Sequence, residues 1–243
     1  MKKLVISFLL AVMPVFVAAG HASELRLDKA PVNLRDQASL QRGAQMFVNY
    51  CLSCHSAKFM RYNRMGADLG ISDEQLKANL MFGTDKVGDT MTVAMADEDS
   101  KAWFGNPPPD LSVIARARGA DWLYAYMRTF YLDESKPMGV NNLAFPDVGM
   151  PHVLWKLQGL QKPVYRTNAD GRNEIEGFEM VKPGTMEPAE YDAAVGDLVN
   201  FLVYMGEPMQ LERQALGIKV LIFLTIFFVL AYLLKKEYWK DIH

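Results

Sequence analysis

The 243-residue sequence predicts a mainly α-helical protein with long loops, one small β-hairpin and a single C-terminal transmembrane helix. Apolar residues recur at helical spacing in several segments, glycine and proline interrupt the stretches between them, and one long apolar run lies near the C-terminus. Half of the residues are apolar and the formal net charge is −2. This composition excludes a disordered chain and a basic nucleic-acid-binding protein, so no nucleic acid partner is expected.

The first 22 residues are predicted to be a signal peptide. Lys2 and Lys3 precede a run over residues 4–19 that is apolar apart from one serine, and Gly20-His21-Ala22 has the small-x-small pattern of a signal peptidase site. A retained transmembrane span is the alternative, but Pro14 and the small residues at the end of the run favour cleavage. The run lacks the Arg- and Ser-rich character of an organellar presequence, which indicates bacterial export.

A helix is predicted over residues 36–50. Leu40, Gly43, Ala44 and Phe47 fall on one face of it at positions i, i+3, i+4 and i+7. A glycine in such a stripe lowers helix propensity, so we expect Gly43 to permit a close crossing with another helix.

The two cysteines of the chain follow this helix as Cys51-Leu52-Ser53-Cys54-His55. In an exported protein such a pair indicates a redox dithiol, half of a zinc site or a haem attachment site. A dithiol prefers a helix N-terminus after a strand, and no second ligand pair is present to complete a zinc site. Haem attachment needs only two thiols and the adjacent imidazole. We therefore predict one covalently bound haem c, with His55 as an axial ligand.

Residues 66–109 are predicted to be rich in loops, with a short helix at 73–82. The acidic cluster at 97–99 is expected to be a solvated surface. A helix capped by Asp110 should follow and end at Gly119.

Two further helices and the hairpin complete the domain. Asp121 is expected to cap a helix with an apolar face, and residues 141–152 form a loop containing Gly and Pro. A short surface hairpin is predicted over 164–181. The last helix starts at Glu187-Pro188. The apolar face of the helix after Asp121 consists of Leu123, Tyr126, Met127 and Phe130.

An electron-transfer haem with six ligands needs a second axial residue, and methionine opposite histidine raises the reduction potential. Met127 and Met205 lie in helical apolar stripes and are expected to pack in the core. Met150 lies in a loop where Gly149 and Pro151 constrain the backbone, so its side chain is a candidate ligand. His152 is the rival, but we expect it to be a surface or haem-edge residue.

The C-terminal region is predicted to anchor the chain in a membrane. An apolar run of about twenty residues matches the length that a helix needs to cross roughly 30 Å of hydrocarbon, although a buried core helix is the alternative. Lys235 and Lys236 follow the run, and positive charge favours the cytoplasmic side. The predicted organisation is a signal peptide at 1–22, a periplasmic domain at 23–213, a transmembrane helix at 214–234 and a cytoplasmic tail at 235–243. The protein would then cross a bacterial inner membrane once, in contact with its lipid.

Several motifs together resemble the cytochrome c1 family, which is the haem subunit of ubiquinol–cytochrome c reductase (the cytochrome bc1 complex). The resemblance extends from about Asp36 to Trp239 and implies a c-type cytochrome domain. In order along the chain, the motifs are Cys51-x-x-Cys54-His55-Ser56, Pro108-Pro109-Asp110-Leu111-Ser112, Arg116-Ala117-Arg118, Phe145-Pro146 and Gly149-Met150-Pro151, followed by the C-terminal apolar run.

The resemblance also implies roles for individual residues. Met150 matches the axial methionine, Arg118 matches an arginine that contacts a haem propionate, and Pro109 matches a wall along the haem edge. Trp122 is a further candidate for the haem edge and stands where the family often has tyrosine. His152 stands where the family usually has proline or another small residue, which leaves ligation by two histidines open.

The function implied is a relay of single electrons from the Rieske iron–sulfur protein to a soluble or membrane-bound cytochrome c. Cytochrome b would be a further partner, and the chain would not be an enzyme on its own. The alternatives are an independent membrane-tethered cytochrome c and a haem peroxidase with an open sixth position. Residues 24–213 carry 20 Lys and Arg against 26 Asp and Glu, which gives a net charge of −6. This charge could attract a basic soluble partner, or it could serve only to keep the domain soluble.

Overall fold

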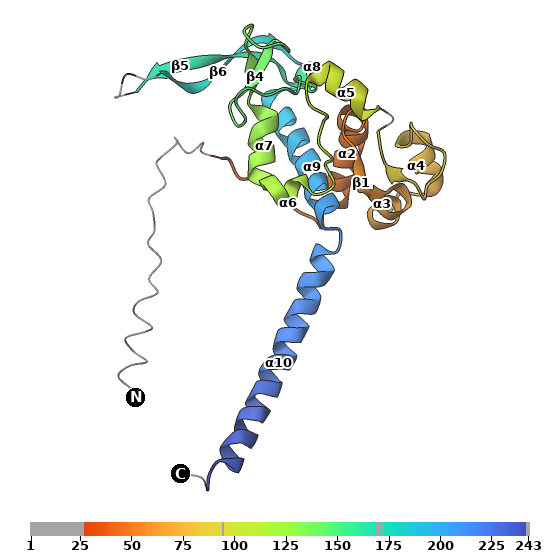
Figure 1. Ribbon diagram of the computed structural model, residues 1–243, viewed down its shortest axis with the longest axis vertical. Coiled ribbons are helices and arrows are strands. Elements are labelled where there is room, and N and C mark those ends of the chain that lie inside the picture. Colours follow the sequence, from red (N-terminus) through yellow and green to blue (C-terminus); the bar gives the residue numbers. More distant parts are fainter. Residues whose placement is uncertain (1–26, 94, 169–170, 172, 242–243) are drawn as a thin grey trace.

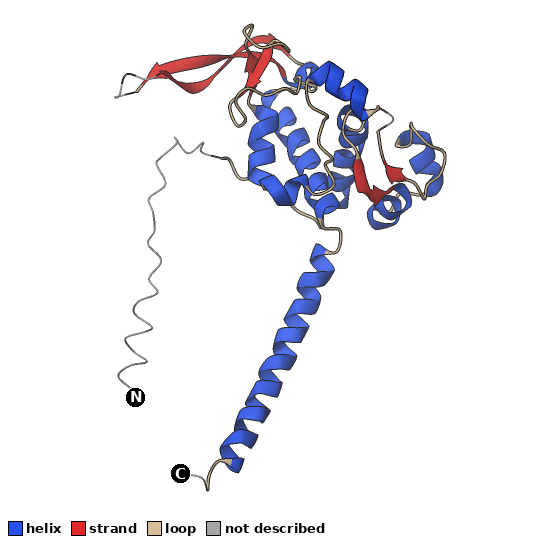
Figure 2. Cartoon of the chain, in the orientation of Figure 1, coloured by secondary structure: helices blue, strands red, loops and turns tan. Residues whose placement is uncertain are grey.

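The computed structural model describes residues 27–93, 95–168, 171 and 173–241. The signal peptide predicted at 1–22 lies outside the described residues. The described chain forms a helical domain that stands at one end of a long helix, α10 (Gln210–Tyr238) (Figure 1). Helices dominate the domain, and its strands form small two-stranded sheets (Figure 2). The predicted mainly α-helical class is therefore confirmed.

The predicted helix at 36–50 is present as helix α2 (Gln37–Met46), which continues as the π-helical turn η1 (Phe47–Cys51). Asp36 caps its start, because the Asp36 carboxylate accepts a hydrogen bond of 3.0 Å from the backbone N–H of Ser39. The π-helical turn carries the chain directly into the cysteine motif.

The region from residue 57 to 104 contains more regular structure than the sequence predicted. The short helix expected at 73–82 is α4, which begins after Ser72 with a capping box formed by Ser72 and Gln75. The acidic cluster at 97–99 is exposed as expected and forms the first turn of a helix, where negative charge complements the helix dipole. The elements here are β1 (Ala57–Arg61), α3 (Tyr62–Leu69), α4 (Asp73–Asn79), β2 (Thr90–Met91) and α5 (Asp97–Phe104); β1 and β2 pair antiparallel.

Two predicted helix caps are wrong. Asp110 precedes helix α6 (Ile114–Arg118), but its carboxylate accepts hydrogen bonds from the backbone N–H groups of Lys58 and Ser112. Asp121 lies inside the first turn of helix α7 (Ala120–Arg128) and accepts a hydrogen bond of 2.8 Å from the backbone N–H of Ala30. Both carboxylates therefore fasten distant segments of the chain.

Helix α7 ends before Phe130, which was expected on its apolar face. Phe130 begins strand β3 (Phe130–Leu132), which pairs antiparallel with β4 (Val140–Asn142). The short helix α8 (Trp155–Gln158) leads into the predicted hairpin, which is longer than 164–181 and protrudes from the domain (Figure 1). Its strands are β5 (Gly159–Thr167) and β6 (Asn173–Pro183).

The last helix of the domain, α9 (Pro188–Gly206), begins where predicted, with Pro188 in its first turn. It crosses α2 at Gly43, where a Cβ atom would lie 2.1 Å from the backbone oxygen of Asp197. The close helix crossing predicted at Gly43 is therefore confirmed.

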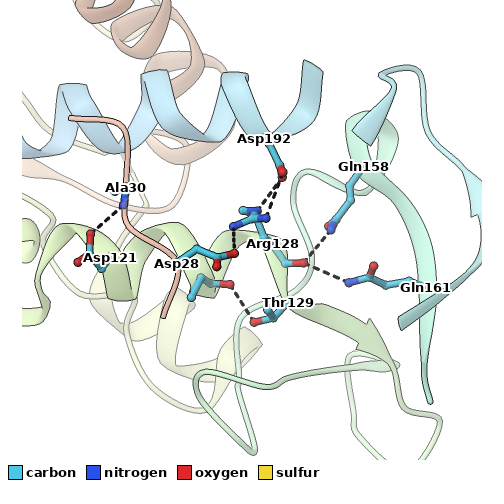
Figure 3. A network of polar contacts seen from close by, with 9 residues as sticks. Asp28, Ala30, Asp121, Arg128, Thr129, Gln158, Gln161 and Asp192 are labelled. Carbon is cyan, nitrogen blue, oxygen red and sulfur yellow. Dashed lines mark hydrogen bonds and ion pairs between the residues drawn. The ribbon is translucent and has the colours of Figure 1, made fainter. Parts of the chain in front are cut away.

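A polar network joins the N-terminal segment, α7, α9 and the start of the hairpin (Figure 3). The guanidinium of Arg128 binds the carboxylate of Asp192 through two hydrogen bonds and that of Asp28 through a third. The backbone oxygen of Arg128 accepts hydrogen bonds from the side-chain amides of Gln158 and Gln161. These contacts fix the C-terminal end of α7 relative to its neighbours.

Helix α10 is 29 residues long, which at 1.5 Å per residue gives about 43 Å. It has no buried residue, and among the described residues it is the one helix long and apolar enough to cross a membrane. It extends beyond the predicted span of 214–234 at both ends.

Candidate haem-binding site

A cavity of about 350 Å³ opens beside the cysteine motif. Its walls come from η1 and the turn after it, the last residue of α5, α6, α7, one residue of α9 and the two loops around Pro109 and Met150. The structure brings to this cavity all seven residues assigned to the haem from the sequence and the family resemblance. They are Cys51, Cys54, His55, Pro109, Arg118, Trp122 and Met150.

The ring of His55 is held by the backbone of Pro109, which also lines the cavity. Its Nδ1 atom lies 2.8 Å from the backbone oxygen of Pro109. A hydrogen bond from Nδ1–H to that oxygen leaves Nε2 as the atom available to a metal. Burial also lowers the pKa of His55, which favours the neutral ring that binds metals.

The two cysteines are free thiols, Cys51 buried and Cys54 partly buried. Burial raises the pKa of Cys51 to about 12, the opposite of the lowered value that a dithiol catalyst needs. In the described part of the chain, no three residues of the types His, Cys, Asp and Glu gather as a possible metal site. The thiols therefore fit attachment of a porphyrin better than redox exchange or zinc binding.

The sulfur of Met150 lies at the cavity and accepts a hydrogen bond from a second cavity residue. The Tyr126 hydroxyl donates to Met150 Sδ at 3.4 Å, and burial raises the pKa of Tyr126, which keeps this phenol protonated. This contact between a helix and a loop was not predicted. Met127, expected only in the core, is buried but also lines the cavity, whereas Met205 is buried away from the lining.

His152 is neither a surface residue nor part of the cavity lining, which corrects the expectation from the sequence. Its side chain is buried, its ring stacks on Phe130 with centroids 4.9 Å apart, and its Nε2 atom has no hydrogen-bond partner among the described residues. Burial lowers the pKa of His152 to about 4. The structure thus places this imidazole in the interior, against the ring of Phe130.

Arg118 lies exposed at the mouth of the cavity. Its guanidinium carbon is 5.0 Å from the centre of the Trp122 ring and 5.7 Å from that of Phe145. No ion pair joins it to a carboxylate among the residues that the structure describes. A charge in this position can pair with an anionic group of a bound molecule. Apolar walls, two thiols, an imidazole, a thioether and this guanidinium together fit the chemistry of a haem.

Comparisons with known proteins show similarity over nearly the whole chain. The sequence profile of the Cytochrome C1 family matches residues 28–162 and 175–242. Among similar proteins, a cytochrome c1 from Allochromatium vinosum is 51% identical over all of both chains. A protein named ammonia monooxygenase gamma subunit, from Nitrosomonas europaea, is 52% identical over all of this chain and 98% of its own. A cytochrome c1 from Rhodospirillum rubrum is 29% identical and aligns over 85% of this chain and 83% of its own.

Proposed function

This chain belongs to the cytochrome c1 family, and we propose that it relays single electrons from the Rieske iron–sulfur protein to a soluble or membrane-bound cytochrome c. Cytochromes c1 are membrane-anchored haem proteins of electron transport. The observation that carries the proposal is the meeting of Cys51, Cys54, His55 and Met150 at one mainly apolar cavity. That donor set is the one expected for a covalently attached haem with histidine and methionine as axial ligands.

A bound haem c would supply the one-electron ferric–ferrous couple. The residues around the cavity would attach the haem, orient its ligands and set its reduction potential. Cys51 and Cys54 would form the thioether bonds, and the Pro109 carbonyl would hold the His55 ring so that Nε2 faces the iron. The sulfur of Met150 would favour the reduced state and so keep the potential high. Arg118 would compensate a propionate at the mouth of the cavity.

The membrane arrangement forms part of the proposal. Residues 1–22 would be removed as a signal peptide, 23–213 would lie in the periplasm, 214–234 would span the bacterial inner membrane, and 235–243 would face the cytoplasm. Helix α10 supports this arrangement, because it leaves the domain as one long exposed apolar helix (Figure 1). Its lipid-exposed length suits packing against the membrane helices of cytochrome b.

Three other functions compete with this proposal. An independent membrane-tethered carrier would use the same haem site without partner subunits. A haem peroxidase would need an open sixth position, which a thioether at the cavity disfavours. The third function is suggested by the name of the Nitrosomonas europaea relative: the chain would be a subunit of an ammonia monooxygenase. The family match favours the quinol–cytochrome c reductase over this third function.

Purification of the full-length protein from its own membranes in mild detergent tests the proposal. A tag at the C-terminus leaves the haem domain unmodified. We expect cytochrome b and the Rieske protein to co-purify, and quinol to reduce the haem of this chain only while the Rieske protein is present. Recovery of a lone monomer, or of monooxygenase subunits in place of these two, would contradict the proposal.

A further inference from the structure

We propose that Tyr126 is a positioning residue that fixes the Met150 thioether and raises the reduction potential of the site, by donating its phenolic hydrogen to Met150 Sδ. The proposal rests on the proposed role of Met150 as an axial ligand and adds a second residue that tunes it. It also gives Tyr126 a function that its place on the apolar face of α7 does not require.

The contact itself has the geometry of a hydrogen bond to sulfur. Tyr126 Oη lies 3.4 Å from Met150 Sδ, and both residues line the cavity. Tyr126 is only 8% exposed, so little water competes for its hydroxyl. A thioether sulfur has two lone pairs and is a weak acceptor. One lone pair can therefore bind a metal while the other accepts the hydrogen of Tyr126.

Aromatic neighbours hold the phenol ring in place. Trp122 stacks on Tyr126 with ring centroids 5.0 Å apart and planes at 16°, and Phe130 meets it edge-on at 5.2 Å and 71°. Trp122 precedes Tyr126 by one turn of α7 and Phe130 follows by four residues, just past the end of the helix. The ring is therefore enclosed on both sides along the helix direction, and its hydroxyl is aimed by packing.

A single buried side chain ties the loop that leads to Met150 to the turn of α7 that carries Tyr126. Asn142 is fully buried, and its Nδ2 donates to the backbone oxygen of Tyr126 at 2.7 Å. Its Oδ1 accepts from the backbone N–H groups of Ala144 at 2.9 Å and Phe145 at 3.1 Å. Asn142 therefore fixes the first part of the loop that leads to Met150 relative to the backbone of Tyr126.

Two electrostatic effects give the sign of the potential shift. A sulfur that accepts a hydrogen bond has less electron density to donate, and ferric iron depends on that donation more than ferrous iron. The hydroxyl also directs the positive end of its dipole toward Met150 Sδ, and a positive partial charge near a bound iron would disfavour the more positively charged state. Both effects favour the reduced form, so loss of the hydroxyl should lower the potential.

The test compares two tyrosine-to-phenylalanine variants of the intact holoprotein. Tyr126→Phe removes only the oxygen that contacts Met150. Tyr191→Phe is the matched control, because Tyr191 is also buried and its hydroxyl donates to the backbone oxygen of Met127 at 2.7 Å, but Tyr191 does not line the cavity. The readouts are the midpoint potential from a redox titration, the far-red sulfur-to-iron charge-transfer band, and thermal unfolding.

We expect Tyr126→Phe to keep the far-red band, shifted in position, and to favour the oxidised form about threefold more than the wild type. At about 59 mV per tenfold for one electron, this is a fall of ~30 mV. Tyr191→Phe should lower thermal stability and leave the potential unchanged. An unchanged potential in Tyr126→Phe, or an equal fall in Tyr191→Phe, would overturn the role of Tyr126 alone. A wild-type protein without the far-red band would instead overturn the role of Met150, and with it the proposal.

Discussion

Replacement of Gly43 by alanine tests the helix crossing that supports the haem motif. In the structure an added Cβ would lie 2.1 Å from the backbone oxygen of Asp197 and 2.7 Å from Cβ of Phe201. Neither atom belongs to the flexible end of a side chain, so the helices α2 and α9 must move apart. Helix α2 continues through η1 to Cys51, so the displacement should also reach the cysteine motif.

The size of the effect follows from two opposing terms. Overpacking a close contact costs about 1–3 kcal/mol, and the upper end applies because the contact is with backbone. Alanine has a higher helix propensity than glycine, which stabilises helix α2 by about 1 kcal/mol. The net loss of about 2 kcal/mol should lower the Tm of a domain of this size by roughly 4–8 °C.

Thermal unfolding of the detergent-solubilised holoprotein, followed by circular dichroism, measures this change. Gly177→Ala is the control, because a Cβ at that position would meet nothing within 4 Å. The control should leave Tm nearly unchanged. An unchanged or raised Tm in Gly43→Ala would show that α2 and α9 do not cross at this glycine.

Two further predictions concern charge. Arg118→Gln should lower the midpoint potential measured by redox titration, because removal of a positive charge near the site favours the oxidised state. The free energy of unfolding should stay within about 0.5 kcal/mol of the wild type. An unchanged potential would contradict a contact of Arg118 with a haem propionate. Burial tends to raise the pKa of Asp110, but hydrogen bonds from Ser112 and the backbone of Lys58 leave it lowered. A carboxylate with a lowered pKa in the folded state stabilises that state above its unfolded pKa of about 3.9, and this contribution is lost as the pH falls through the folded-state pKa. Asp110→Asn should therefore make denaturation below about pH 4 less steep; equal acid sensitivity in variant and wild type would contradict this assignment.

Features that depend on local spacing were predictable from the sequence. The cysteine motif, the close approach at Gly43, the start of α9 and the apolar α10 each follow from residues that are near one another in the chain. The periodic stripe around Gly43 already indicated a crossing, because a helix tolerates glycine there only for a packing reason. Met150 was one of two candidates until the family resemblance favoured it.

Features that depend on contacts between distant residues were not predictable. Asp110 and Asp121 look like helix caps, but their partners are backbone groups of Lys58 and Ala30, which only the folded chain brings near. The contact of Tyr126 with Met150 joins a helix to a loop 24 residues later. His152 was expected at the surface or the haem edge, yet its side chain is buried and stacks on Phe130. Helices α3 and α5 were missed because short segments give weak periodicity.

The far-red charge-transfer band of the oxidised protein tests the central claim, that Met150 completes a haem site begun by Cys51, Cys54 and His55. The account predicts that the wild type shows the band and that Met150→Leu, which conserves most of the side-chain volume, loses it and has a lower midpoint potential. A wild-type spectrum without the band, or a band that persists in Met150→Leu, would contradict the account.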